Sequence, residues 1–303
     1  MSKEPKVHYA PLPDFPWDGE EFDFSPDVRF VRVDKITEPI LSRFKFSTRE
    51  QKLLNNSSYW LEFQSDEDPR DVVVLILLSL WLVMPMHLRA PFCFTAPFGD
   101  EDLVRSLPHI FWGSTDGQIF DEESLLLAKK QFSSLKIVYA NQQRLNDALQ
   151  LTFHGCWAEH WQVALISHAA ALEAILTYSE KRGLTDRLCK AYASLVKDDE
   201  SERITAYEEF STSYEIRHDA VHGRAYKISS DLRVGKLKKL QDLLRQLWQV
   251  ILSSQPCIEI LEKDDGEREV FFAEKTNGIA WPEKSHSGKS KQCAPHPTKK
   301  ISK

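Results

Sequence analysis

The segment DEESLLLAKKQFSSLKIVYANQQRLNDALQLTF, residues 121–153, decides the fold class of this protein. Acidic residues open it and apolar residues recur at helical spacing, which predicts a long amphipathic helix. Four later segments repeat this character, at 158–183, 185–197, 201–222 and 231–252. The expected ends and caps are Gly155 and Gly183 after the first and second helices, Thr185 before the third, Gly223 after the fourth, and Ser229 or Ser230 before the fifth. Residues 121–255 are therefore predicted to form an all-α bundle.

The region before this bundle, residues 27–120, has a mixed pattern. Apolar and polar residues alternate over 27–34 and 59–63, which predicts half-buried strands. The run VVVLILLSLWLVMPM at 72–86 is almost wholly apolar, but it is shorter than the ~20 residues that a bilayer needs. Asp68 and Pro69 stand where an N-cap and a first helical residue belong, so a buried core helix is expected, with a membrane segment as the alternative.

Three terminal segments complete the predicted organisation. Residues 1–26 mix acidic with aromatic side chains and are expected to form an arm that packs loosely on the body. Residues 256–281 contain the turn signal KDDGE between CIEIL and REVFFAE, which predicts a β-hairpin. Residues 282–303 are rich in lysine and predict a disordered basic tail. The fold class is α+β, with a C-terminal all-α bundle preceded by a mixed α/β N-terminal region.

The composition excludes several classes of function. Lysine and arginine number 39 against 45 acidic residues, so a nucleic-acid partner would have to meet a local basic patch. The five cysteines are odd in number and none form a CxxC pair, which predicts a reducing compartment and no thiolate metal site. The N-terminus lacks the apolar core of a signal peptide, so a cytoplasmic protein is expected. The motifs GxGxxG, GxxxxGK[ST] and GxSxG are absent from the sequence.

The segment YEIRHDAVHG, residues 214–223, carries the most informative chemistry. Five residues follow one another at steps of three and four along the preceding helix and predict an inward-facing stripe: Tyr207, Phe210, Tyr214, Arg217 and Val221. An inward guanidinium requires an anion, because an unpaired buried charge is very costly. Glu173 lies in the apolar segment VALISHAAALEAIL and requires a cation, so Arg217 is its expected partner. A purely structural ion pair explains both residues equally well.

Two histidines follow Arg217 on the same predicted helix. His222 is the last residue before Gly223, where the helix dipole favours the charged imidazole and suits proton transfer near neutral pH. His218 lies four residues earlier, on nearly the same face. This spacing, with Asp219 between, also fits a helical zinc site with a carboxylate base, although that reading needs a third ligand. His154, His160 and His168 are on other helices, and nothing in the sequence selects one. Capping or surface roles are the simplest alternatives.

The bundle resembles the HEPN superfamily, and within it the Apea-like branch. Three segments carry the resemblance in this order: ALEAIL at 171–176, LTDRLCKAYASLV at 184–196 and YEIRHDAVHG at 214–223. The family signature is an arginine, four to six residues and a histidine near a helix end, and here four residues separate Arg217 from His222. Gly223 follows, as it does in many Apea-like members. The resemblance covers residues 155–255, about one third of the chain.

The resemblance implies a metal-independent endoribonuclease that works as a homodimer, often in toxin–antitoxin or phage-defence systems. Arg217 would bind the scissile phosphate, His222 would transfer protons, and His218 fits the polar position after the arginine of the signature. Glu173 would orient Arg217, while Tyr214 and Asp219 are further candidates for substrate contact. No metal, cofactor or membrane is implied, and the expected partners are RNA, a second copy and an antitoxin or defence-system protein. The alternative is a non-catalytic helical module that binds RNA or protein.

Overall fold

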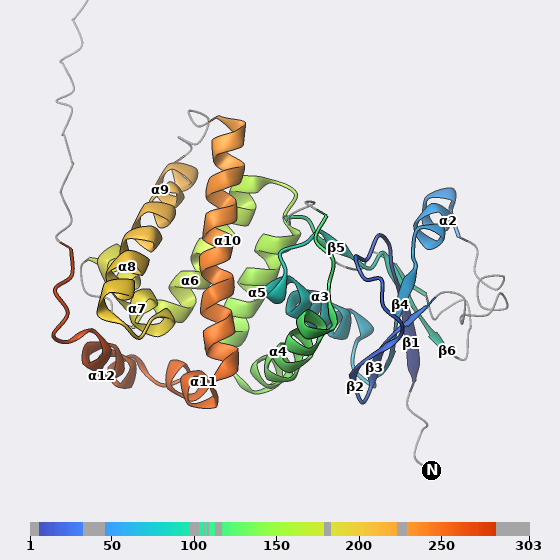
Figure 1. Cartoon of the computed structure of the whole chain (residues 1–303), viewed down its shortest axis with the longest axis horizontal. Coiled ribbons are helices and arrows are strands. Elements are labelled where there is room, and N and C mark those ends of the chain that lie inside the picture. The colour runs from blue at the N-terminus through green and yellow to red at the C-terminus, as the bar shows by residue number, and fades with distance from the viewer. Residues whose placement is uncertain are drawn as a thin grey trace, which may run out of the picture.

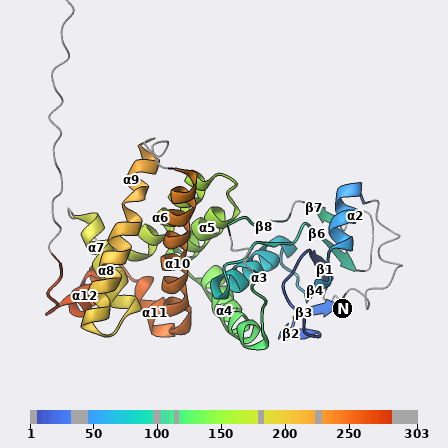
Figure 2. The ribbon, with the colours of Figure 1, turned by 45° about the horizontal axis from the view of Figure 1, so that its top comes forward.

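The protein is mixed α+β, with a strand-bearing N-terminal part and a helical C-terminal part (Figure 1). A computed structural model describes residues 6–32, 46–96, 103–105, 107, 109–112, 117–178, 183–222 and 229–282. The sheet stands at one end of the molecule and the helical bundle at the other, with the helices α3 (Pro69–Val83) and α4 (Glu122–Asn141) between them (Figures 1 and 2). One core nevertheless runs through both parts, from Phe30 in the sheet to Trp248 in the bundle. The basic tail expected at 282–303 lies, beyond Pro282, outside the described residues.

The sheet has six strands in the order β2-β3-β4-β1-β6-β7, and every neighbouring pair is antiparallel. The strands are β1 (Val7–Leu12), β2 (Phe22–Ser25), β3 (Val28–Arg32), β4 (Tyr59–Gln64), β6 (Phe92–Ala96) and β7 (Leu103–Arg105). Tyr9 in β1 lies opposite both Glu62 in β4 and Phe94 in β6. The strands predicted at 27–34 and 59–63 are confirmed.

The expectation of a loosely packed arm over residues 1–26 is wrong, because this segment supplies β1 and β2. Strand β1 lies in the interior of the sheet, paired along one side with β4 and along the other with β6. Pro11 lacks a backbone donor, which disguised the strand in the sequence. The structure tolerates Pro11 because β6 pairs only with residues 7–9 of β1.

The apolar run at 72–86 forms the buried core helix α3 (Pro69–Val83), as predicted. The Asp68 side chain caps it by accepting a bond from the Arg70 N–H, and Pro69 opens the helix. On the opposite side of the sheet, Leu54 from α2 (Thr48–Asn55) joins a small cluster with Trp60 and Phe94. No helix in the described part of the chain combines the length and apolar character needed to span a bilayer.

The predicted bundle is present. Its helices are α4 (Glu122–Asn141), α5 (Arg144–Trp157), α6 (Trp161–Leu176), α7 (Leu184–Val196), α8 (Glu200–Tyr214), α9 (Ile216–Val221) and α10 (Ser230–Ser253). Helix α10 runs the height of the bundle and packs against α4, α6, α7 and α8 (Figure 1). Its Trp248 is fully buried and donates through Nε1 to Thr152 Oγ1 at 2.9 Å. Ser229 is the N-cap residue of α10, which confirms the first of the two predicted cap residues.

Several predicted helix ends are wrong. Residues 121–153 form two helices and not one. The backbone is extended at Gln142, where α4 ends, and α5 begins at Arg144. The Glu262 carboxylate accepts bonds from the backbone N–H groups of three successive residues there, Gln143, Arg144 and Leu145, at 2.6–3.2 Å. This distant side chain caps α5, and a local pattern cannot reveal it.

Two glycines have roles other than those predicted. Gly155 lies inside α5 and does not end a helix, because the His168 ring from α6 packs directly on it. Helix α6 ends at Leu176, well before Gly183. Gly183 adopts φ +85° at the N-cap of α7, a left-handed conformation that glycine adopts easily, and Thr185 lies within the first turn.

The β-hairpin predicted at 256–281 is also wrong, and two short helices take its place. They are α11 (Gln255–Leu261), capped by Ser254, and α12 (Asp265–Thr276), capped by Asp264. The KDDGE segment therefore begins a helix, since the Asp264 carboxylate accepts a bond from the Glu267 N–H at 3.0 Å. Arg268 in α12 is fully buried and donates to the Ile175 carbonyl, which ties this segment to the bundle.

Candidate functional site

The predicted site residues come from the end of α6 and from the junction of α8 with α9. The single helix expected over 201–222 is divided at Glu215, where the His218 N–H bonds the Glu215 carbonyl in a tight 3₁₀-type turn. The predicted buried stripe is confirmed for Tyr207, Phe210 and Tyr214. It is wrong for Val221, whose side chain is 51% exposed. The turn breaks the helical register, so the stripe is not continued along α9.

Arg217, Glu173 and Tyr214 form one cluster of charged and polar groups. Arg217 Nε lies 2.6 Å from Glu173 Oε1, and Arg217 Nη2 donates to Glu173 Oε2 at 3.3 Å. The Tyr214 hydroxyl donates to the same Oε1, and the guanidinium carbon lies 5.9 Å from the centre of the Tyr214 ring. The ion pair expected between Arg217 and Glu173 is therefore present, and its geometry is bidentate.

Tyr214 has a more direct role than the sequence indicated. Burial and the neighbouring Glu173 charge raise the pKa of Tyr214 well above its usual value, so its hydroxyl stays a proton donor. The ring also stacks on Phe210, with 5.5 Å between centroids. Tyr214 thus fixes the Glu173 carboxylate to the aromatic core of the bundle.

Part of the Arg217 guanidinium remains available to a ligand. Its side chain is 38% exposed, compared with 22% for Glu173. Glu173 engages Nε and Nη2, and Nη1 makes no hydrogen bond to any described residue. A phosphate oxygen approaching from solvent would meet the N–H groups of Nη1 without displacing Glu173.

His218 and His222 stand together on the exposed side of α9. Their ring centroids are 4.3 Å apart, and the rings are tilted by 57°. Both side chains are exposed, whereas Asp219 is half-buried. The structure brings the two histidines together, but no hydrogen bond joins either of them to the cluster of Arg217 among the described residues. Gly223, which follows His222, lies outside the described residues.

The zinc alternative lacks its third ligand in the described part of the chain. No group of three histidine, cysteine, aspartate or glutamate residues is arranged there to hold a metal ion. His168 is fully buried, and the Gln241 side-chain nitrogen lies 3.1 Å from its Nε2. His154 and His160 are exposed on α5 and at the start of α6.

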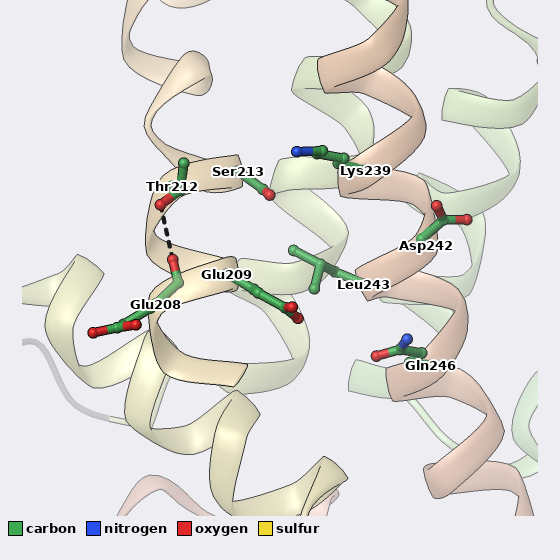
Figure 3. A pocket seen from close by; sticks show the side chains of 8 residues that line it. All are labelled: Glu208, Glu209, Thr212, Ser213, Lys239, Asp242, Leu243 and Gln246. Atoms are coloured by element: carbon green, nitrogen blue, oxygen red, sulfur yellow. Dashed lines mark hydrogen bonds between the residues drawn. The ribbon is translucent and has the colours of Figure 1, made fainter. Parts of the chain in front are cut away.

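A pocket of about 410 Å³ lies on another side of α8, between α8 and α10 (Figure 3). Glu208, Glu209, Thr212 and Ser213 line it from α8, and Lys239, Asp242, Leu243 and Gln246 line it from α10. It contains none of the predicted site residues, and its lining has three carboxylates and a single lysine. That charge balance disfavours a polyanion, so the pocket is not the expected RNA site.

No family model matches this chain, and neither the curated proteins nor the solved structures include a protein that matches it.

Proposed function

We propose that this protein is a metal-independent endoribonuclease of the HEPN type. The observation that carries the proposal is the half-exposed arginine at the start of α9, held by Glu173 and Tyr214, with two exposed histidines on the same short helix. Arg217 and His222 are five residues apart, which is about 7.5 Å along a helix axis. A cation and an imidazole at such a separation can both reach one RNA backbone segment.

The proposed chemistry uses the nucleophile that RNA itself supplies. A base removes the proton of the 2′-OH, the oxygen attacks the adjacent phosphorus, and an acid protonates the leaving 5′-oxygen. His222 provides the proton transfers, while Arg217 stabilises the charge that develops on the phosphoryl oxygens. His218, beside His222, and Asp219 on the same helix contact the substrate. The products are a 2′,3′-cyclic phosphate and a 5′-hydroxyl end.

A homodimer would supply the second proton-transfer group. Helix α9 and the start of α10 lie at the same end of the bundle (Figure 1). Arg233 near the start of α10 lies 5.4 Å from the centre of the Trp161 ring at the start of α6. This end of the bundle carries five exposed apolar side chains, namely Val163, Ile166, Val221, Leu232 and Val234. A two-fold contact over this surface would place two copies of His222 near one RNA strand, one as acid and one as base.

The resemblance to HEPN proteins also indicates a biological role for the proposed nuclease. Such a nuclease would act as a toxin or in phage defence inside the cell, and an antitoxin or another defence-system protein would restrain it. An unprovoked RNA cleavage activity would be harmful to the host, so a restraining partner follows from the proposed chemistry.

The test is cleavage of single-stranded RNA in the presence of EDTA. Wild type is compared with Arg217→Ala and His222→Ala, and with two matched controls, Arg70→Ala and His154→Ala, which change exposed residues outside the site. We expect each site variant to lose about 10²–10⁴-fold in rate, as is usual for loss of a general acid–base group or a charge-stabilising group, and the controls to retain activity. Full activity in both site variants would refute the proposal, and loss of wild-type activity on chelation would favour a metal enzyme.

A non-catalytic RNA- or protein-binding module is the second candidate. The bidentate pair between Arg217 and Glu173 favours it, because a structural ion pair needs no substrate to explain its geometry. This candidate predicts no cleavage of any RNA. It also predicts a lower melting temperature for both Arg217→Ala and Glu173→Gln.

A further inference from the structure

A second pocket lies where the N-terminal part meets the bundle, and the proposed nuclease chemistry does not use it. Its volume is about 590 Å³, within the range usual for small-molecule sites. Helix α2 and the small sheet of β5 (Leu88–Arg89) with β8 (His109–Ile110) surround it, and Trp157 closes it from the end of α5. Its lining residues are Ser47, Arg49, Glu50, Leu53, His87, Arg89, Pro91, Phe92, Leu107, His109, Phe111 and Trp157.

Two arginines and two histidines line this pocket. Arg49 and Arg89 face it together with His87 and His109, while Glu50 is the only carboxylate among the lining residues. Glu50 is engaged in the capping box of α2, where its carboxylate accepts a bond from the Ser47 N–H at 2.7 Å. The pocket therefore brings together two guanidinium groups and two imidazoles on a chain whose net charge is −6.

The two nearest carboxylates, Asp14 and Glu50, engage Arg89 and the start of α2 rather than Arg49. Asp14 pairs with Arg89 at 2.5 Å, whereas Arg49 is exposed on α2 and has no ion-pair partner among the described residues. Partial burial and the Arg89 charge lower the pKa of His87. Burial and the charge of His87 lower the pKa of His109, against an opposing effect of Glu159. A neutral imidazole still carries one N–H donor, so each ring can hydrogen-bond an anionic oxygen.

Aromatic rings occupy the same pocket. The Phe111 ring lies 4.3 Å from the His109 ring and 5.8 Å from the His87 ring, centroid to centroid. Phe92 is almost fully buried and lines the pocket, while the Trp157 side chain is 39% exposed. Exposed tryptophan next to a half-buried phenylalanine offers flat apolar surface for a planar ring.

The frame of the pocket is held in place by backbone bonds. The Phe111 N–H donates to the Cys156 carbonyl at 2.9 Å, next to Trp157. Trp112 Nε1 donates to the Ala158 carbonyl at 2.5 Å, on the other side of Trp157. These bonds fix the segment of Phe111 to the end of α5 that carries Trp157, and the pairing of Arg89 with His109 joins β5 to the same segment.

We propose that this pocket binds a nucleoside phosphate. Arg49, Arg89 and the two imidazoles would bind the phosphate, and Trp157 with Phe111 would stack on the base. The proposal does not rest on the nuclease function, since none of these residues belongs to the cluster of Arg217. The ligand is a free nucleotide or the terminal nucleotide of a nucleic-acid chain, which share this chemistry.

Isothermal titration of the full chain with AMP, adenosine and inorganic phosphate tests the proposal. We expect AMP to bind at least ten times more tightly than either part alone. Arg49→Ala should weaken AMP binding about 10–100-fold, the effect of one charge-assisted hydrogen bond, and Trp157→Ala should weaken it as well. Lys52→Ala is the matched control, because Lys52 is exposed on the same helix but does not line the pocket. Arg217→Ala should leave AMP binding unchanged, which separates this site from the nuclease site.

Two results would overturn the proposal. One is AMP binding no tighter than adenosine and phosphate, and the other is an equal loss in Arg49→Ala and Lys52→Ala. Titration with a 5′-phosphorylated oligodeoxynucleotide distinguishes a free nucleotide from a chain end as the ligand. This probe lacks the 2′-OH, so the proposed nuclease cannot cleave it. Binding of this probe as tight as AMP assigns the pocket to a chain end, and binding more than tenfold weaker assigns it to free nucleotides.

Discussion

Glu173 binds Arg217 through both carboxylate oxygens, at 2.6 Å to Nε and 3.3 Å to Nη2, although the two residues are 44 positions apart in the sequence. The Tyr214 hydroxyl donates to the same carboxylate, so the Glu173 side chain binds both Arg217 and Tyr214. The orientation of the guanidinium is therefore set by α6 and α8, while the arginine itself belongs to α9. Glu173 does not engage Nη1, so a phosphate oxygen could bind there without displacing this carboxylate.

Glu173→Gln should impair catalysis through Arg217 without removing the arginine. An amide offers only one acceptor oxygen, so the bidentate pair is lost and the guanidinium is no longer held in one orientation. We expect kcat for RNA cleavage to fall about 10–100-fold, the effect of one charge-assisted hydrogen bond, with a smaller change in KM. Glu208→Gln, an exposed glutamate on α8, is the control and should retain wild-type kinetics. Wild-type kcat in Glu173→Gln would show that Glu173 does not position Arg217 for catalysis.

Tyr214→Phe should separate positioning from stability. The ring and its stacking on Phe210 remain, and only the bond to the charged Glu173 is lost, which is usually worth about 1.5–3 kcal/mol of stability. Tyr192→Phe is the matched variant, since the Tyr192 hydroxyl bonds Gln246 at 2.9 Å outside the site. Urea unfolding should show a loss of stability in both variants, about 1 kcal/mol for the neutral bond of Tyr192 and more for Tyr214, whereas RNA cleavage should fall only in Tyr214→Phe. Equal activity in the two variants would contradict a positioning role.

Two glycine-to-alanine changes in helices should have opposite signs. A Cβ at Gly155 would lie 2.4 Å from His168 Cε1, so alanine there should destabilise the protein by about 1–3 kcal/mol. A Cβ at Gly235 in α10 would meet no atom within 4 Å, so alanine there should stabilise by about 0.5–1 kcal/mol through helix propensity. Urea denaturation at neutral pH measures both. Stabilisation by Gly155→Ala would show that His168 does not pack on this glycine.

His168 should make stability depend on pH in mildly acidic solution. Full burial lowers the pKa of His168 from 6.5 to about 3, so between these values the unfolded chain binds a proton that the folded chain does not. Lowering the pH through this window therefore favours unfolding, and at pH 5 the loss is about 2 kcal/mol relative to pH 7. Denaturant unfolding from pH 7 to pH 4 measures the slope. His168→Asn should flatten it and the exposed His160→Asn should not, and an unchanged slope in His168→Asn would contradict a neutral buried imidazole.

The sequence predicts the helices well where one face of each is apolar. The run at 69–84 identifies α3 through its own cap residues, and the stripe of Tyr207, Phe210 and Tyr214 identifies the buried face of α8. It fails where a distant group decides the local structure. Glu262 caps α5 from over 100 residues away, and β1 is a strand only because β4 and β6 flank it.

The candidate site shows the same division. The pairing of Glu173 with Arg217 could be predicted because a charged group in an apolar helix needs a partner of opposite sign. The turn at Glu215, which takes His218 and His222 to the exposed side of α9, leaves no mark in the spacing of the residues. The pocket of Arg49 and Trp157 could not be predicted at all, because its walls come from four separate segments.

The central claim, that Arg217 and His222 cleave RNA through its own 2′-OH, is tested most directly with a single defined cleavage site. An RNA oligonucleotide that wild type cuts in EDTA is compared with the same oligonucleotide carrying one 2′-deoxy nucleotide immediately 5′ of that site. We predict that the substitution abolishes cleavage at that bond alone. The product of the unmodified oligonucleotide should carry a 2′,3′-cyclic phosphate. Arg217→Ala and His222→Ala should cleave neither oligonucleotide. Cleavage of the 2′-deoxy bond at the wild-type rate would contradict the account.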